Sequence, residues 1–174
     1  TLELDPGYAG AHLGLGLIYT KQNRLIEAGK EHERAIELDP DNAMLHSALA
    51  NTRMAAGHYA EAAAAYQQAL KLEPNDAAAH HGLGQAYAKR SQPAEAIEAY
   101  HKALGLSADN AEIHYNLGMS YAQSDQMAEA IAAYQKAVEL DPDYLEAHYG
   151  LGQAYLRQGQ AEEGTKELEI FRQL

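Results

Sequence analysis

Large, small and aromatic residues recur along the chain with a period of 34 residues. Within each segment a leucine stands at the seventh place, a small residue at the eighth and, in most copies, a tyrosine at the eleventh. Separations of one, three and four place these residues on one face of a helix. The pattern therefore predicts a first amphipathic helix in each of five segments. The three columns are Leu15, Leu49, Leu83, Leu117, Leu151; Gly16, Ala50, Gly84, Gly118, Gly152; and Tyr19, Arg53, Tyr87, Tyr121, Tyr155.

A turn and a second helix follow in each segment. The fifteenth place holds Asn23, Gly57, Ser91, Asp125 and Gly159, which are turn formers, and Gly or Asn there can stop a helix in the left-handed conformation. Within the second helix, the twentieth place of the segment holds a small residue and the twenty-fourth a large one. The residues at the twenty-fourth place are His32, Tyr66, Tyr100, Tyr134 and Leu168. Pro40, Pro74 and Pro142 end their segments, and Asp41, Asp76 or Asn75, and Asp109 or Asn110 are candidate caps for the next helix.

The repeat organises the whole chain. The segments are 9–42, 43–76, 77–110, 111–144 and a shorter 145–174. A period of this length is typical of an array in which each unit buries its apolar face against its neighbours. The opening LELDP matches IELDP at 36–40 and VELDP at 138–142, which close segments, so we interpret residues 1–8 as the tail of a preceding repeat. We therefore expect the sequence to be a piece of a longer chain.

The pattern L-G-x-x-Y … A-x-x-x-Y-x-x-A … P resembles the tetratricopeptide repeat, and the resemblance covers essentially the whole chain. It implies one all-α domain, a right-handed alpha-alpha superhelix (solenoid) of 34-residue helix-turn-helix repeats. Arg53 departs from the pattern because it replaces the first-helix aromatic of the second repeat. Ala108 replaces the closing proline of the third, and Gly164, Leu168 and Phe171 are irregular in the last repeat.

Charge and composition exclude several classes of partner. There are 13 Lys and Arg against 25 Asp and Glu, a formal net charge of −12. This balance disfavours nucleic acid and anionic membrane surfaces, because both are bound largely through Lys and Arg. No apolar run is long enough to span a membrane, so we expect no membrane insertion. The chain has no cysteine, which removes thiol chemistry, disulfides and zinc-thiolate sites. The compartment is not fixed by these features, and we favour the cytoplasm.

The sequence carries no catalytic motif. There is no phosphate-binding glycine loop, no nucleophile elbow, no HExxH and no EF-hand loop. Glycines such as those in LGLG at residues 13–16 recur with the period and are explained by close helix packing. We therefore expect no enzyme activity, no cofactor and no metal in this chain.

A histidine occupies the fourth place of every repeat: His12, His46, His80, His114 and His148. Equivalent side chains on helices roughly 8–10 Å apart cannot converge on one metal ion. A flat, half-polar packing group explains all five copies. A pH-sensitive packing role is the alternative, because a half-buried imidazole resists protonation, and it predicts a loss of stability between pH 6 and 5.

The resemblance implies a concave groove lined by the first helices at repeat positions 2, 5, 6, 9, 12 and 13. These positions vary between repeats, whereas the packing positions do not. Tyrosine, methionine and amide side chains there suit recognition of an extended peptide or a partner helix. The predicted partner-binding residues are Asn51, His81, Gln85, Lys89, Glu112, Tyr115, Asn116, Met119, Gln123, Tyr149, Gln153 and Arg157.

Two family binding modes fit poorly. The chaperone-binding clamp needs basic residues beside asparagine, and only Asn51 matches. The asparagine ladder of the O-linked N-acetylglucosamine transferase needs Asn at the sixth place, where only Asn116 has it; the others are Gly14, Ala48, Gly82 and Gly150. We predict a scaffold or adaptor that binds protein or peptide. The alternatives are a substrate-recruiting segment of a larger enzyme or export machinery, and a module that self-associates through its solenoid ends.

Overall fold

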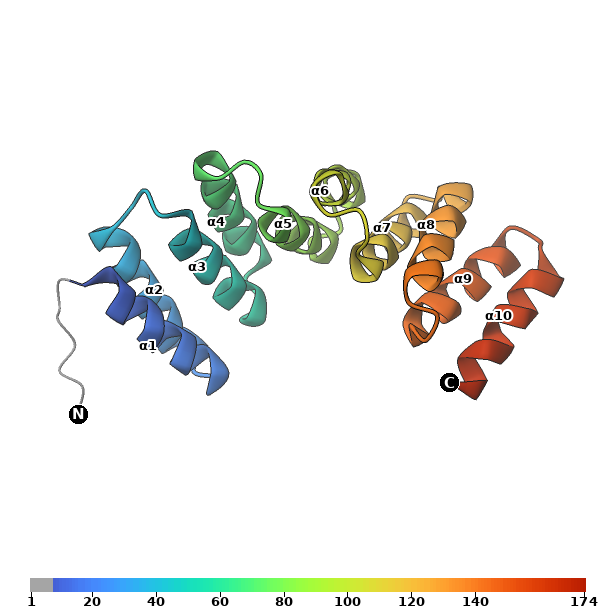
Figure 1. Ribbon diagram of the computed structural model, residues 1–174, viewed down its shortest axis with the longest axis horizontal. Helices are drawn as coiled ribbons and strands as arrows, with labels where there is room; N and C mark the ends of the chain where they lie inside the picture. Colours follow the sequence, from blue (N-terminus) through green and yellow to red (C-terminus); the bar gives the residue numbers. More distant parts are fainter. Residues whose placement is uncertain (1–7) are drawn as a thin grey trace. The chain divides into compact units, whose positions relative to one another are not determined.

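The computed structural model describes residues 8–174, and within them every regular element is an α-helix (Figure 1). The predicted tail, residues 1–8, lies outside the described residues except for Tyr8. The chain divides into two compact units, Thr1–Arg90 and Ser91–Leu174. Unit 1 contains α1 (Ala9–Lys21), α2 (Leu25–Leu38), α3 (Ala43–Ala55), α4 (Tyr59–Leu72) and α5 (Ala77–Lys89). Unit 2 contains α6 (Pro93–Leu106), α7 (Ala111–Gln123), α8 (Met127–Leu140), α9 (Leu145–Arg157) and α10 (Ala161–Gln173).

Inside each unit, consecutive helices pack against each other. In unit 1, α1 pairs with α2 and α3 with α4, and α2 and α4 each also pack on the next first helix. In unit 2, α7 pairs with α8 and α9 with α10, while α6 packs on α7 and α8 on α9. First helices also touch directly, since α1 and α5 contact α3, and α7 contacts α9. None of the helices in residues 8–174 combines the length and the apolar character that a membrane crossing requires.

The turns between paired helices have the predicted left-handed residue. Its φ angle is 58° at Asn23, 58° at Ser91 and 60° at Asp125, and 76° and 84° at Gly57 and Gly159. The next backbone N–H then reaches back to the eleventh residue; the N–H of His58, for example, donates to the Arg53 carbonyl at 2.8 Å. This bond pattern satisfies carbonyls at the end of the helix and fixes where it stops.

The predicted caps are only partly confirmed. The Asp76 carboxylate accepts from the backbone N–H groups of Ala78 and Ala79 at 2.9 and 3.0 Å, and Asn110 caps α7 through the Ile113 N–H at 3.1 Å. The prediction for Asp41 is wrong, because Asn42 takes the capping place of α3 and makes no side-chain cap. Its amide instead donates to the Asp39 carboxylate at 2.8 Å.

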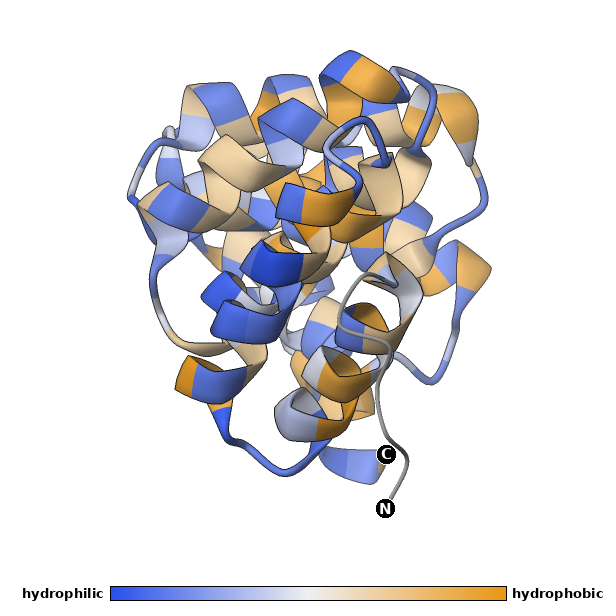
Figure 2. Ribbon diagram, turned by 90° about the vertical axis from the view of Figure 1, so that its left-hand side faces the viewer, coloured by the Kyte–Doolittle hydropathy of each residue, from blue (hydrophilic) through white to orange (hydrophobic). Residues whose placement is uncertain are grey.

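The core consists of alanines and glycines packed around large aromatic rings, for which the small residues leave space. Alanines at the twentieth place, such as Ala62 and Ala130, are fully buried. Beside them, Tyr66 and Tyr134 are 4% exposed. Figure 2 shows the consequence for the helices, many of which carry hydrophobic residues on one side and hydrophilic residues on another, while the connecting loops are mostly hydrophilic. Burial of these small and large residues holds neighbouring helices together.

Four of the recurring histidines connect a first helix to the loop before it. The ring Nε2 donates to the carbonyl six residues earlier in four repeats. These bonds run from His46 to Pro40, His80 to Pro74, His114 to Ala108 and His148 to Pro142, at 2.8–3.0 Å. In the first and last repeats, Nδ1 of His12 and of His148 also bonds a carboxylate, Glu31 and Glu167, at 2.7 Å each. These histidines therefore provide a hydrogen-bond donor to a backbone carbonyl in the loop that joins one repeat to the next.

No metal ladder is formed by these rings. Within residues 8–174, no group of three or more His, Asp or Glu side chains is arranged to hold a metal ion. The ring nitrogens that bond loop carbonyls are already used by the fold. The periodicity of the sequence predicts a structural role for the histidine in every repeat, but it does not reveal which backbone carbonyl the imidazole binds.

A different histidine is the one whose pKa responds most clearly to burial. His32 stands at the twenty-fourth place of the first repeat and is 0% exposed. Burial lowers its pKa, and the nearby Glu31 carboxylate opposes this shift only in part. Its Nδ1 is 3.1 Å from the Thr52 hydroxyl, and its Nε2 has no hydrogen-bond partner. Protonation would therefore bury a charged N–H group without an acceptor.

We expect the free energy of unfolding to fall as the pH drops below 6.5, and His32→Leu to remove most of that slope. The unfolded chain binds a proton at His32 near pH 6.5, whereas the folded chain resists it, so the contribution is complete above that pH and is lost below it. One such group changes stability by at most about 1.4 kcal/mol per pH unit. Leucine is chosen because Leu168 stands at the same place in the last repeat.

Urea unfolding of both proteins at pH 7.5, 6.5, 5.5 and 5.0 measures the two slopes. His101→Leu serves as the control, because it makes the same substitution at an exposed histidine of another second helix. Identical slopes in wild type and His32→Leu would show that another group controls the acid response.

Candidate functional site

A groove opens between the first helices of the fourth and fifth repeats, inside unit 2. We call it the α7–α9 groove. Its hollow has a volume of about 210 Å³. Residues of α7, α8 and α9 line it: Tyr115, Met119, Ala122, Met127, Tyr134, Tyr149, Gly150, Gln153, Ala154 and Arg157. Five of the twelve predicted partner-binding residues therefore meet at one hollow, namely Tyr115, Met119, Tyr149, Gln153 and Arg157.

Tyr134 forms the base of the α7–α9 groove. Its ring lies between two helices because glycine on each one leaves room: a Cβ added to Gly118 on α7 would lie 2.7 Å from the ring, and one on Gly150 of α9 would lie 2.9 Å from it. The ring also belongs to a buried cluster with Ile131 and Leu151. This packing explains why two first helices can approach each other at this point.

Aromatic contacts hold the sides of the groove. The Tyr115 ring is 5.8 Å from Tyr134 and 5.2 Å from Tyr144, and the Tyr149 ring is 5.2 Å from Phe171 on α10. Burial raises the pKa of Tyr115, and the Glu146 carboxylate adds to the shift. The Tyr115 phenol is therefore a neutral hydrogen-bond donor at physiological pH.

Exposed surface in the groove comes from both apolar and polar groups. Met119 is 42% exposed and Tyr149 is 48% exposed, so a ligand can reach both. Gln153 is exposed on the next turn of α9. Arg157 closes one end and forms an ion pair with Asp125, with a nitrogen–oxygen distance of 3.3 Å. The combination offers aromatic and thioether area, one amide, and a guanidinium that is already partly neutralised.

The other seven predicted residues lie elsewhere. In unit 2, Glu112 and Gln123 are exposed on α7 outside the residues that line the hollow. Asn116 is 8% exposed and lies with the packing residues, so it offers a ligand little surface. The sixth repeat position is thus part of helix packing here, as Gly150 also shows by its contact with Tyr134.

In unit 1, four predicted residues lie on α3 and α5. Asn51 is exposed and its side-chain oxygen accepts a hydrogen bond from the Tyr66 hydroxyl. Burial raises the pKa of Tyr66 to about 12, with Asp76 adding to the shift, so that hydroxyl remains a donor. On α5, His81 and Gln85 are half-buried and Lys89 is exposed. At the sixth place between them, Gly82 is buried against the Tyr66 ring.

Comparison with known proteins identifies the repeat. A family model described as TPR repeat matches residues 16–57 and 118–159, and a second one, described as Tetratricopeptide repeat, matches residues 47–111. Together they cover residues 16–111 and 118–159, which is most of the chain. The chain belongs to the tetratricopeptide repeat family. The comparison with curated proteins found no match.

Several solved structures share this tetratricopeptide repeat fold. A crystal structure of MamA is 25% identical in sequence, with a TM-score of 0.87, over 91% of this chain and 92% of that one. MamA from residue 41 onward, from Desulfovibrio magneticus RS-1, has a TM-score of 0.92 at 22% identity, over 98% and 95%. YrrB, described as a TPR protein with an unusual peptide-binding site, has a TM-score of 0.83 at 23% identity, over 98% and 88%.

These findings confirm the predicted fold class, an all-α solenoid of helix-turn-helix repeats. They also support the general role of a protein-interaction scaffold. Tetratricopeptide repeat proteins are generally interaction modules rather than catalysts. The family assignment therefore directs attention to surfaces, and the α7–α9 groove is one such surface.

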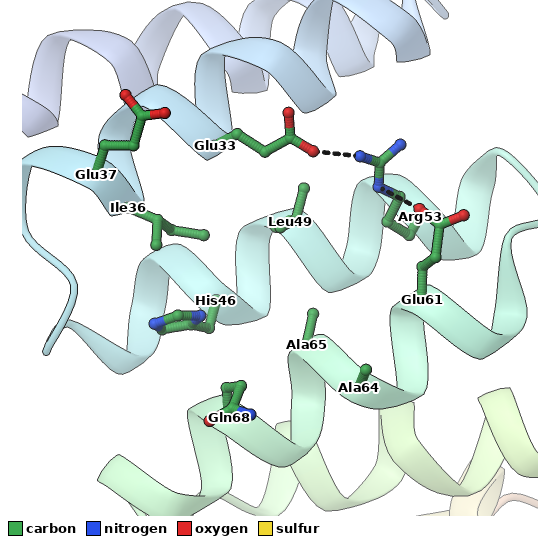
Figure 3. Close-up of a pocket in the computed structure, with 10 residues that line it drawn as sticks. All are labelled: Glu33, Ile36, Glu37, His46, Leu49, Arg53, Glu61, Ala64, Ala65 and Gln68. Carbon is green, nitrogen blue, oxygen red and sulfur yellow. Dashed lines mark hydrogen bonds and ion pairs between the residues drawn. The ribbon is translucent and has the colours of Figure 1, made fainter.

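A second groove, which the sequence reasoning did not identify, lies inside unit 1. We call it the α2–α4 groove, because second helices α2 and α4 form its sides and α3 its base. Figure 3 shows Leu49 near its centre, Ile36 pointing in from α2, and Arg53 at one end between two glutamates. The Arg53 guanidinium pairs with Glu33, and with Glu61 at 3.1 Å.

The sequence did contain a signal for this groove. Arg53 replaces the tyrosine that other tetratricopeptide repeats of this chain have at the eleventh place. In each case that residue bonds to the side chain 20 residues earlier: Gln67 to Tyr87, His101 to Tyr121 and Gln135 to Tyr155, at 2.6–2.8 Å. Glu33 and Arg53 are the charged version of this pair. Glu33 thus supplies the negative charge that pairs with the guanidinium of Arg53.

Proposed function

We propose that the protein is an interaction scaffold that binds an extended peptide or a partner helix in the α7–α9 groove. The observation that carries the proposal is the convergence of Tyr115, Met119 and Tyr149 around the hollow over Tyr134. Aromatic and thioether side chains around a pocket are the usual anchors of a protein interface. YrrB, which has the same fold, provides a precedent in its described peptide-binding site.

The chemistry of the groove favours a ligand with one apolar anchor and a backbone available for hydrogen bonding. The exposed faces of Met119 and Tyr149 can enclose an aliphatic or aromatic side chain. The Gln153 amide is able to both donate to and accept from a peptide backbone. The Arg157 guanidinium is shared with Asp125, so the site carries little net charge and binding should depend only modestly on salt.

The nature of the partner follows from charge as well. A formal net charge of −12 opposes binding to polyphosphate backbones, so a protein or peptide is the expected partner rather than nucleic acid. Self-association through the ends of the helix array is a separate possibility that the groove does not require.

Affinity capture from a source lysate tests the proposal. Wild type is compared with Met119→Ala/Tyr149→Ala, and retained proteins are identified by mass spectrometry. We expect at least one protein to be retained by wild type and reduced about tenfold or more with the double variant, because both exposed anchors are lost. Tyr115 is left intact because it also packs on Tyr134 and Tyr144.

The matched control is Leu17→Ala. Leu17 holds the same ninth repeat position as Met119 and is 48% exposed, but it lies on α1. It should retain the same proteins as wild type. Equal retention by wild type and the double variant would place the contact outside the α7–α9 groove.

A further inference from the structure

The α2–α4 groove is the larger hollow of the two, with a volume of about 540 Å³. Its base is apolar: Leu49 and Ile36 are half-buried there, and Ala64 and Ala65 of α4 keep the opposite side low (Figure 3). An aliphatic side chain of a partner could lie over Leu49 without displacing any described side chain. The proposed function does not use this surface, which lies in the other unit of the chain.

The charges around the groove have an uneven balance. Three carboxylates line it: Glu37 pairs with Arg34 at 2.6 Å, whereas Glu33 and Glu61 face the guanidinium of Arg53. Glu33 and Glu61 both pair with Arg53, so one positive charge serves two negative ones. Both glutamates are about half exposed, at 49% and 59%. The end of the groove around Arg53 is therefore negative and accessible to a cation.

The equivalent surface over α9 in unit 2 is built differently. There Lys166 and Glu167 stand at the places of Ala64 and Ala65, and Tyr155 stands at the place of Arg53. Large side chains thus occupy the positions that alanine leaves open in unit 1. Over α7 in the same unit, Ala132 and Ala133 keep the low wall, but Tyr121 again stands at the place of Arg53. The shared arginine is therefore the feature that distinguishes the junction of the first two repeats.

We propose that the α2–α4 groove is a second docking site, which binds a basic amphipathic segment of a partner protein. The partner presents a leucine-like side chain to Leu49 and Ile36. A neighbouring lysine or arginine of the partner pairs with either Glu33 or Glu61. Arg53 then pairs with the other glutamate alone. The site combines apolar burial for affinity with charge complementarity for selection against acidic segments.

Fluorescence anisotropy with three synthetic peptides tests this site. The basic probe is a labelled helical peptide with leucines on one face and lysines on the others. One comparison peptide replaces the leucines with serine and keeps the charge. The other replaces the lysines with glutamate and keeps the leucines. We expect the basic probe to bind about tenfold or more tightly than either comparison peptide, and less tightly as salt is raised.

A steric block locates the binding. Ala64 is exposed in the groove, and Ala64→Tyr should weaken the basic probe about tenfold or more by filling the space beside Leu49. Ala132→Tyr is the matched control, since Ala132 is exposed at the same repeat position on α8. Both substitutions are made at exposed helix positions, where a tyrosine is compatible with the helix. Circular dichroism and thermal melting confirm that each variant is folded.

The outcomes separate the two sites. Loss of binding with Ala64→Tyr, and wild-type binding with Ala132→Tyr and with Met119→Ala/Tyr149→Ala, supports the second site whether or not the first one is correct. Equal binding of the serine peptide would show that general attraction to an acidic protein is sufficient, and would overturn the proposal. So would unchanged binding by Ala64→Tyr. A molar mass that rises with concentration in wild type but not in Ala64→Tyr would mean that a second copy of the chain occupies the groove, which also contradicts it.

Discussion

Replacing Tyr134 with alanine is expected to lower the free energy of unfolding by about 3–5 kcal/mol. The ring is 4% exposed and is enclosed by Gly118 on one side and Gly150 on the other. Neither glycine has a side chain that could move into the space, so the cavity would remain largely unfilled. The same change removes the base of the α7–α9 groove, and binding of the groove ligand should be lost with it.

Urea unfolding followed by circular dichroism measures this effect. Tyr149→Ala is the control, because Tyr149 is 48% exposed and its main ring contact is Phe171. It should cost about 1 kcal/mol or less. Tyr134→Ala and Tyr149→Ala losing similar amounts of stability would mean that the ring between the two glycines does not hold α7 and α9 together.

Gly82→Ala is expected to destabilise the protein by about 1–3 kcal/mol, although alanine is the better helix former. A Cβ at this place would overlap the Tyr66 ring, which is buried against α5. Because Tyr66 also hydrogen-bonds Asn51, the ring cannot withdraw without losing that contact. The helix containing Gly82 would have to move away from α4.

The same substitution at Gly14 should have the opposite sign. Gly14 holds the identical sixth position of the first repeat, but an added Cβ there meets nothing within 4 Å. Gly14→Ala should therefore stabilise the protein by about 0.5–1 kcal/mol through lower backbone entropy in the unfolded chain. Thermal melting of both variants measures the contrast. A stabilised Gly82→Ala protein would contradict the role of glycine as the site of ring insertion.

The sequence predicted the helices and their turns well because those depend on local chemistry. The turn residue at the fifteenth place needs a left-handed backbone, and its residue types showed this directly at Gly57 and Gly159. The spacing of leucine, glycine and tyrosine likewise reports which face of a helix is buried. The family resemblance added the pairing of helices. The family matches confirmed the resemblance, and the contacts between helices within each unit show the pairing.

The site was harder to predict because one helix position can have two uses. The sixth place was assigned to the groove, yet Gly82, Asn116 and Gly150 are used in packing between repeats. Variation along a column therefore does not prove exposure: Gly82 and Gly150 each receive a tyrosine ring there. Tyr115, Met119 and Tyr149 were assigned to the groove from their repeat positions, but the hollow between them depends on Tyr134, which belongs to a second helix.

Contacts that join distant positions could not be predicted from the helical period. The bond from a histidine ring to the carbonyl six residues earlier depends on how the loop bends back, as at His80 and Pro74. The pair of Glu33 and Arg53 crosses from one repeat to the next. This pair becomes visible in the sequence only when residues 20 positions apart are compared, because a glutamate then stands opposite the irregular Arg53.

Site-specific photocrosslinking tests the central claim most directly. A photoreactive phenylalanine analogue is placed at Gln153, which is exposed in the α7–α9 groove, or at Glu139, which is exposed on α8 and does not line it. The account predicts that a partner captured from lysate crosslinks at Gln153 and not at Glu139, and that Met119→Ala/Tyr149→Ala abolishes the crosslink. A partner that crosslinks at Glu139 and not at Gln153 would show that the groove between the first helices is not where this protein binds.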